Sequence, residues 1–168
     1  MTSAELIADA FERIREAARD AVEGLGPDQL SFRVDAEANS IAWLVWHLTR
    51  VQDDHVAAVV GVPQVWMSSG WSTRFALPLD EEDTGYGHRS EQVSAVRCSA
   101  ELLLGYLDAV SAATLEFVQH LADGDLDRIV DERFDPPVTM GVRLVSVISD
   151  DLQHAGQAAY VRGVIERA

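Results

Sequence analysis

The feature that most constrains the fold of this chain is a helical repeat of apolar residues. Between Leu6 and Val22, apolar side chains recur at intervals of three and four residues, which is the spacing of one face of an α-helix. Thr2 and Glu5 have the pattern of a capping box at the start of this segment, and Gly24 follows its end. The segment therefore predicts an amphipathic helix with one buried face.

Three further segments show the same repeat. A second helix is predicted from about Ile41 to Val60, with Gly61 as its stop signal. A third is predicted to begin after the capping residue Ser99, and a fourth at about Thr139, running to near the C-terminus. Four helices of this length predict an all-α fold, a four-helix bundle that we expect to occupy residues 1–168 as a single domain.

A long irregular stretch, GVPQVWMSSGWSTRFALPLDEEDTGYGHRS, separates the second and third predicted helices. We interpret it as a long crossover loop of the bundle. Loops of this length in a compact domain are usually functional or disordered, and its two tryptophans argue against disorder. We therefore expect this loop to cover the open end of the bundle and to help form a pocket.

Charge and cysteine content exclude several classes of protein. The chain of 168 residues has a formal net charge of −15, so it would be repelled by nucleic-acid backbones, which attract basic surfaces, and it lacks the basic stripe that binds anionic membranes. Its single cysteine, Cys98, can form neither an internal disulfide nor a Cys-rich zinc site. With no signal-peptide pattern and no apolar run long enough to span a bilayer, we expect a cytoplasmic protein.

Candidate metal ligands lie on two of the predicted helices. On the fourth, Asp150 and His154 are four residues apart and share a face, with Gln157 three residues further on. On the second, His47 lies at the edge of the apolar stripe. A bundle interior is where ligands from facing helices meet. Two imidazoles and one carboxylate form a catalytic zinc set or a facial triad suited to iron or nickel.

The remaining candidates are substrate-binding residues. His55 lies two turns beyond His47 on the same broad face, so we expect it to line the pocket rather than to share the ion. We assign the same role to Gln157 and to His88, in the motif DTGYGH. Two loop tryptophans, Trp66 and Trp71, are predicted either to wall this pocket or to anchor the loop on the bundle. Residues with a catalytic role other than metal binding are not identified by the sequence.

Taken together, SIAWLVWHLTRVQDDHV and SDDLQHAGQAAYVRG resemble motifs of the DinB-like superfamily of four-helix metalloproteins. More narrowly, the sequence is similar to the actinobacterial mycothiol-dependent transferases of that superfamily, and it is more distantly similar to mycothiol-dependent maleylpyruvate isomerase. His47, Asp150 and His154 match the metal-ligand positions of the family, although many relatives have His or Glu in place of Asp150. The resemblance implies a divalent metal, commonly zinc although nickel can occupy such sites, with mycothiol as co-substrate and a homodimer as a possible assembly.

Three functions follow from this reading. The first is a metal-dependent thiol S-transferase, in which a metal-activated thiolate attacks a small electrophile; the resemblance implies mycothiol as the thiol. The second is a metal-dependent hydrolase that uses metal-bound water, with His55 or a loop histidine as the general base. The third is a non-catalytic bundle that binds a metal or a small molecule. The partners expected in all three are small molecules.

Overall fold

The computed structural model describes residues 1–167, and four long helices form its framework: α1 (Ser3–Val22), α3 (Ile41–Val60), α7 (Ala100–Val118) and α8 (Met140–Ile165). Each begins at a residue whose side chain accepts a hydrogen bond from the first turn, namely Thr2, Ser40, Ser99 and Thr139. These caps satisfy backbone N–H groups that have no partner inside the helix. The structure confirms the predicted all-α fold and the approximate bounds of all four helices.

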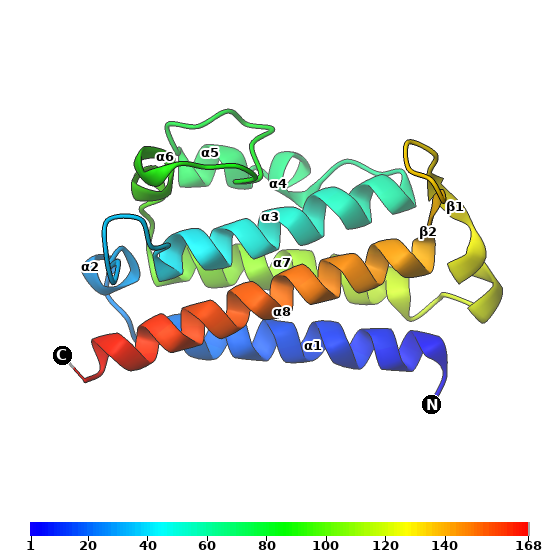
Figure 1. The fold of residues 1–168 in the computed structure, drawn as a ribbon, viewed down its shortest axis with the longest axis horizontal. Helices are drawn as coiled ribbons and strands as arrows, with labels where there is room; N and C mark the ends of the chain where they lie inside the picture. Colours follow the sequence, from blue (N-terminus) through cyan, green and yellow to red (C-terminus); the bar gives the residue numbers. More distant parts are fainter. Residues whose placement is uncertain (168) are drawn as a thin grey trace.

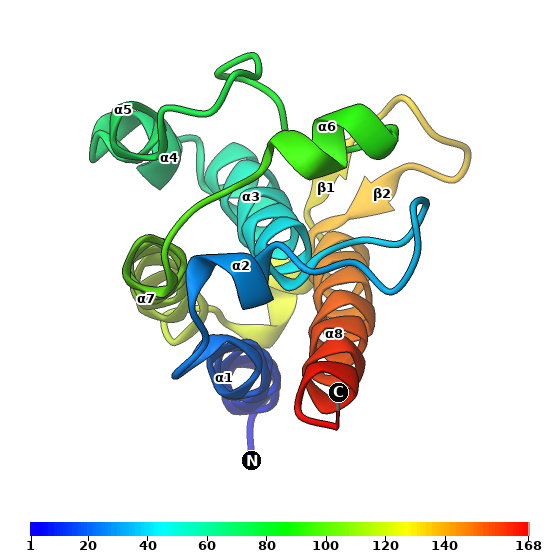
Figure 2. The same ribbon diagram turned by 90° about the vertical axis from the view of Figure 1, so that its left-hand side faces the viewer.

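The four helices pack around one apolar core, with α3 and α7 next to each other and α8 lying along both α1 and α3 (Figures 1 and 2). Helix α8 runs in the opposite direction to α3 (Figure 1). Residues near the middle of α3 therefore lie beside residues near the middle of α8. At one end of the groove between these helices the start of α3 lies beside the end of α8, and at the other end the end of α3 lies beside the start of α8. The short helix α2 (Pro27–Leu30) lies on the connection from α1 to α3.

The crossover between α3 and α7 contains three short helices, α4 (Val65–Ser68), α5 (Trp71–Phe75) and α6 (Ser90–Ala95). Its other residues are irregular, as expected, but the segment lies along the side of α3 (Figure 1) instead of capping one end of the bundle. Trp66 and Trp71 are buried against Tyr106 of α7. These aromatic contacts anchor the crossover on the bundle.

A short 3₁₀ helix, η1 (Asp123–Asp127), and an antiparallel strand pair, β1 (Ile129–Asp131) with β2 (Val138–Thr139), connect α7 to α8. Strand β1 covers the first three residues of the segment IVDERF. None of the helices in residues 1–167 has the length and hydropathy needed to cross a membrane.

Candidate metal centre

His47 lies on the buried side of α3, where only 5% of the residue is exposed. Its Nδ1 atom is 2.5 Å from the backbone carbonyl oxygen of Thr84 in the crossover. A carbonyl can only accept a hydrogen bond, so Nδ1 carries the hydrogen and donates it. This contact fixes the tautomer and leaves the lone pair on Nε2 free to bind a metal.

The indole of Trp43, one helical turn before His47, packs against the face of the imidazole. The two rings are stacked with centroids 4.5 Å apart. Trp43 Nε1 in turn donates to His88 Nδ1 at 3.0 Å, and His88 Nε2 lies 2.8 Å from an Asp83 carboxylate oxygen. Because Nδ1 of His88 accepts, its Nε2 carries the hydrogen and donates to Asp83. The crossover is thereby fastened to α3 on both sides of Thr84.

The other two members of the cluster come from α8. His154 Nε2 is 3.7 Å from Asp150 Oδ1, one turn earlier on the same helix. His154 Nδ1 is 3.2 Å from the side-chain oxygen of Gln157, to which it can donate a hydrogen bond. The amide therefore holds the ring so that Nε2 faces Asp150 and α3.

His47, Asp150 and His154, which we call the triad, each offer a ligand atom, and these atoms all lie within 4.8 Å of one another. The rings of His47 and His154 meet edge to face with centroids 4.8 Å apart. The second carboxylate oxygen of Asp150, Oδ2, is enclosed and has no hydrogen-bond partner among the described residues. An enclosed, unpaired carboxylate oxygen beside two imidazole nitrogens fits a divalent cation, so the triad can bind one.

Burial favours the neutral form of the His47 imidazole. Removal of the ring from water lowers the pKa of His47, because burial disfavours the charged imidazolium. The hydrogen bond to Thr84 raises this pKa and the nearby His154 lowers it, both by less than burial does. A neutral imidazole is the form that binds metals, so the site is prepared for a cation at neutral pH.

A family model matches most of this chain. The model of the DinB superfamily matches residues 10–158, which include all three members of the triad. The chain belongs to the DinB superfamily. A solved structure, that of a conserved protein from Enterococcus faecalis, is similar to this chain at 29% identity, with a TM-score of 0.92 over 100% of this chain and 99% of the other. No curated protein sequence matches the chain.

In this DinB-superfamily chain, the triad lies between two recesses in the groove between α3 and α8. On one side, toward the start of α3, is a recess of about 460 Å³, which we call the amide recess; its lining includes Asn39, Leu44, Gln153, Gln157, Tyr160 and Val161. On the other side is a recess of about 320 Å³, which we call the acidic recess; its lining includes Asp54, His55, Thr84, Tyr86, Ser146 and Asp150. The acidic recess includes one triad member, Asp150, whereas the amide recess adjoins the triad through Gln157, which contacts His154.

Of the residues predicted to line the pocket, some line a recess beside the triad and others do not. His55 lines the acidic recess, and Gln157 both holds His154 and lines the amide recess. His88 does not line either recess, because its side chain is 2% exposed and is engaged by Trp43 and Asp83. His88 therefore holds Trp43, which stacks on His47, and it is not placed to contact a molecule in either recess.

Trp66 and Trp71 line neither of the two recesses beside the triad. Trp66 packs on Phe75 and Tyr106, and its Nε1 atom donates to the carbonyl oxygen of Glu81. Trp71 fills the space in front of Gly105 on α7. Both tryptophans therefore anchor the loop, and Trp66 also lines a separate recess of about 280 Å³ within the crossover, which includes no triad member.

Sequence reasoning missed the residues of the crossover that contact the triad or its recesses. Thr84 acts through its backbone carbonyl, so its side-chain identity carries no signal. Gly85 could have been found, because it lies in the Gly-rich motif DTGYG and has a φ of +91°, a conformation that glycine adopts readily. Tyr86, 92% exposed at the mouth of the acidic recess, is an aromatic side chain with no packing reason to be there.

Proposed function

We propose that this protein is a metal-dependent thiol S-transferase that uses a small-molecule thiol, mycothiol, to attack a small electrophile. The observation that carries the proposal is the triad at the junction of two recesses. A transferase brings two reactants together at one centre, and this arrangement offers each of them a separate approach. A divalent metal held by His47, Asp150 and His154, with zinc the expected ion, supplies Lewis-acid stabilisation of a thiolate.

The state of Cys98 supports an external nucleophile. Its side chain is buried outside the triad, and burial raises the pKa of its thiol to about 12, so at neutral pH it stays protonated and unreactive. The transferred sulfur must therefore come from a bound small molecule. In the reaction, the thiol loses its proton, a carbon–sulfur bond forms at the electrophile, and the bond to the leaving group breaks, the leaving group departing with its electron pair.

His55 is placed to handle protons next to the triad. It lines the same recess as Asp150, and its pKa is lowered mainly by burial and further by the charge of Arg143. A neutral imidazole at neutral pH can accept the proton of an incoming thiol. Its ring is not bonded to a triad member in the structure, so we propose it as a base and not as a ligand.

The position of His55 also favours a second candidate, a metal-dependent hydrolase. In a hydrolase the same imidazole would accept a proton from water, and an ester or amide would occupy the acidic recess. The two functions differ in one requirement, since only the transferase needs an added thiol. A non-catalytic binding protein would show neither reaction.

The decisive experiment is a transfer assay on protein with measured zinc content. Mycothiol, bacillithiol and glutathione are each supplied with a generic electrophile such as chlorodinitrobenzene, with and without added zinc. We expect thiol consumption that depends on zinc and is fastest with mycothiol. Turnover of an ester without any thiol would establish the hydrolase, and zinc binding without either reaction would leave a binding protein.

A further inference from the structure

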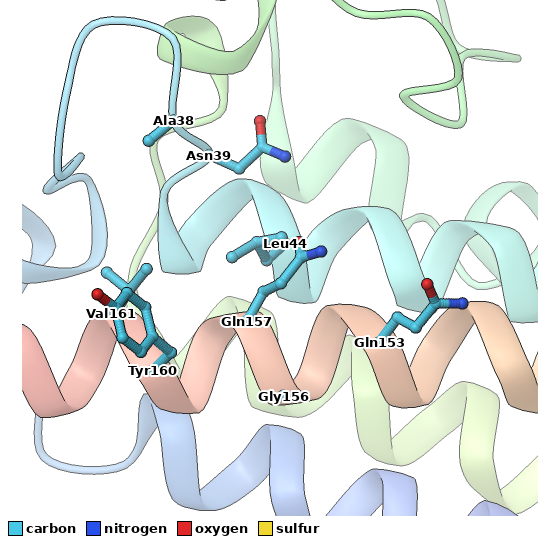
Figure 3. A pocket seen from close by; sticks show the side chains of 8 residues that line it. All are labelled: Ala38, Asn39, Leu44, Gln153, Gly156, Gln157, Tyr160 and Val161. Atoms are coloured by element: carbon cyan, nitrogen blue, oxygen red, sulfur yellow. The ribbon is translucent and has the colours of Figure 1, made fainter.

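The amide recess differs from the acidic recess in the chemistry of its lining. Its polar groups are the side-chain amides of Asn39, Gln153 and Gln157 and the phenol of Tyr160, and no charged side chain among residues 1–167 lines it (Figure 3). These groups are neutral donors and acceptors around an apolar floor that includes Leu44. Such a surface pairs with uncharged hydroxyl and amide groups and offers nothing to neutralise a carboxylate.

The arginines that border this recess are occupied. Arg33 donates to the carbonyl oxygens of Ala36 and Ala38 and to the hydroxyl groups of Ser90 and Ser94. Arg162, next in the chain to Val161, donates to two carbonyl oxygens at the end of α1 and to Glu166. Arg33 therefore acts as a brace for the loop that carries Asn39, and neither guanidinium is directed to a ligand.

The amide recess lies next to the triad. Gln157 contributes to both, since its oxygen lies 3.2 Å from His154 Nδ1 while its side chain lines the recess. Along α3, Leu44 in the recess comes one turn before His47, and along the antiparallel α8, Gln157 comes one turn after His154. A molecule with one end at the triad can therefore extend about one helical turn, roughly 5 Å, and place its other end among the amides.

We propose that the amide recess binds the uncharged, hydroxyl-rich end of the thiol co-substrate while the sulfur lies at the triad. This inference rests on the proposed function and extends it, because it assigns the two recesses to different reactants. A sugar-linked thiol without net charge, such as mycothiol, satisfies the amides and can lay a ring face on Tyr160. Glutathione carries carboxylates that would find no cation here, and the electrophile is left with the acidic recess.

The test measures binding and not turnover. In protein loaded with cobalt(II) instead of zinc, a thiolate that reaches the metal produces a sulfur-to-cobalt absorption band, so thiol affinity is obtained by titration without any electrophile. The probes are mycothiol, glutathione and the amide of N-acetylcysteine, the last of which presents the same uncharged acylated cysteine without the sugar. We expect mycothiol to bind at least about tenfold more tightly than N-acetylcysteine amide, from two or more hydrogen bonds in the recess.

Single-residue variants in the two recesses test where the sugar of mycothiol binds. Tyr160→Leu and Asn39→Leu should each weaken mycothiol binding about threefold to tenfold, the loss of about one hydrogen bond or ring contact, and leave the affinity for N-acetylcysteine amide unchanged. Tyr160 is 66% exposed, so its replacement should not disturb folding. The matched control is Tyr86→Leu, which removes an exposed tyrosine from the acidic recess and should leave mycothiol affinity unchanged.

The other outcomes contradict this inference, the proposed function, or both, and the measurements distinguish these cases. Equal affinities for mycothiol and N-acetylcysteine amide, or for mycothiol and glutathione, would remove the recess from thiol recognition. A loss of mycothiol affinity in Tyr86→Leu but not in the amide-recess variants would place the sugar in the acidic recess. If no thiol produces the absorption band, the proposed function and this inference both fail. Normal mycothiol binding with no transfer would contradict the function alone.

Discussion

His47 Nδ1 and the carbonyl oxygen of Thr84 are 2.5 Å apart, and the next residue of the crossover, Gly85, closes over the same imidazole. A Cβ atom at Gly85 would lie 2.7 Å from His47 Nδ1, a distance that a real side chain does not tolerate. The backbone of the crossover therefore sets the orientation of a metal ligand on α3. Partners of this kind fix the tautomer and direction of a ligating histidine.

Gly85→Ala tests this relationship. The added methyl group should displace His47 or the Thr84 carbonyl, and zinc affinity should fall about 10-fold to 100-fold, the usual cost of losing such a supporting contact. Gly87→Ala is a matched control, because Gly87 also has a positive φ but a Cβ there would meet nothing within 4 Å. Competition with a chromogenic chelator gives both affinities, and equal losses in the two variants would mean that backbone strain alone is responsible.

His154→Ala should remove one of three proposed ligands and reduce zinc affinity more than about 100-fold, beyond the effect of a supporting residue. Transfer activity should fall in proportion to zinc content, and excess zinc should restore part of it. The control is His120→Ala, since His120 is exposed near the end of α7 with its Nδ1 at a backbone carbonyl. Full activity of His154→Ala after chelation would exclude the metal from the reaction.

Cys98→Ser should retain nearly all transfer activity. The thiol of Cys98 is buried and its pKa is about 12, so it should also resist a thiol reagent in the folded protein and react only after denaturation. Comparison of reagent uptake with and without denaturant checks the second statement. Loss of activity in Cys98→Ser, with folding and zinc content unchanged, would make the protein's own thiol the nucleophile.

Tyr86→Ala should raise the KM for the electrophile and leave zinc affinity unchanged. The side chain is 92% exposed at the acidic recess and forms no part of the triad, so its removal alters a contact surface without altering the fold. Steady-state kinetics at saturating thiol, together with a chelator titration, separate the two effects. An unchanged KM would show that the electrophile does not reach this part of the crossover.

Asp151→Asn should stabilise the protein at neutral pH. Asp151 is completely buried on α8 and neither carboxylate oxygen has a hydrogen-bond partner among the described residues. Burial, and secondarily the charge of Asp150, raises the pKa of Asp151 well above its usual range. As the pH rises above about 4, the unfolded chain loses this proton while the folded protein retains it, so the free energy of unfolding falls until the folded-state pKa is passed.

The increase in the free energy of unfolding caused by Asp151→Asn should therefore be greatest near pH 7. It should shrink toward pH 4, where the carboxyl of Asp151 is neutral in both the folded and the unfolded state. Removing a destabilisation of about 1–2 kcal/mol would raise Tm by roughly 2–8 °C for a chain of this size. Thermal unfolding of chelated protein across this pH range measures the change in Tm. The control is Asp20→Asn, since Asp20 is exposed on α1. An equal change in Tm at every pH would exclude titration of Asp151 as the cause.

Local rules determined what the sequence could reveal. Helix positions follow from the spacing of apolar residues and from capping by Thr2, Ser40, Ser99 and Thr139, and these depend only on neighbours in the chain. The pairing of Asp150 with His154 is equally local, because four residues on a helix always return to the same face. The approach of His47 was predictable only from the additional premise that α3 and α8 face each other.

Tertiary structure decided the rest. The carbonyl of Thr84 carries no side-chain signature, and its contact with His47, 37 residues earlier, depends on the path of the crossover along α3. Trp66 and Trp71 could equally well wall a pocket or anchor a loop, because an indole buries well in either place. Packing against Tyr106 resolved that choice, since a contact between distant segments exists only after the whole bundle has assembled.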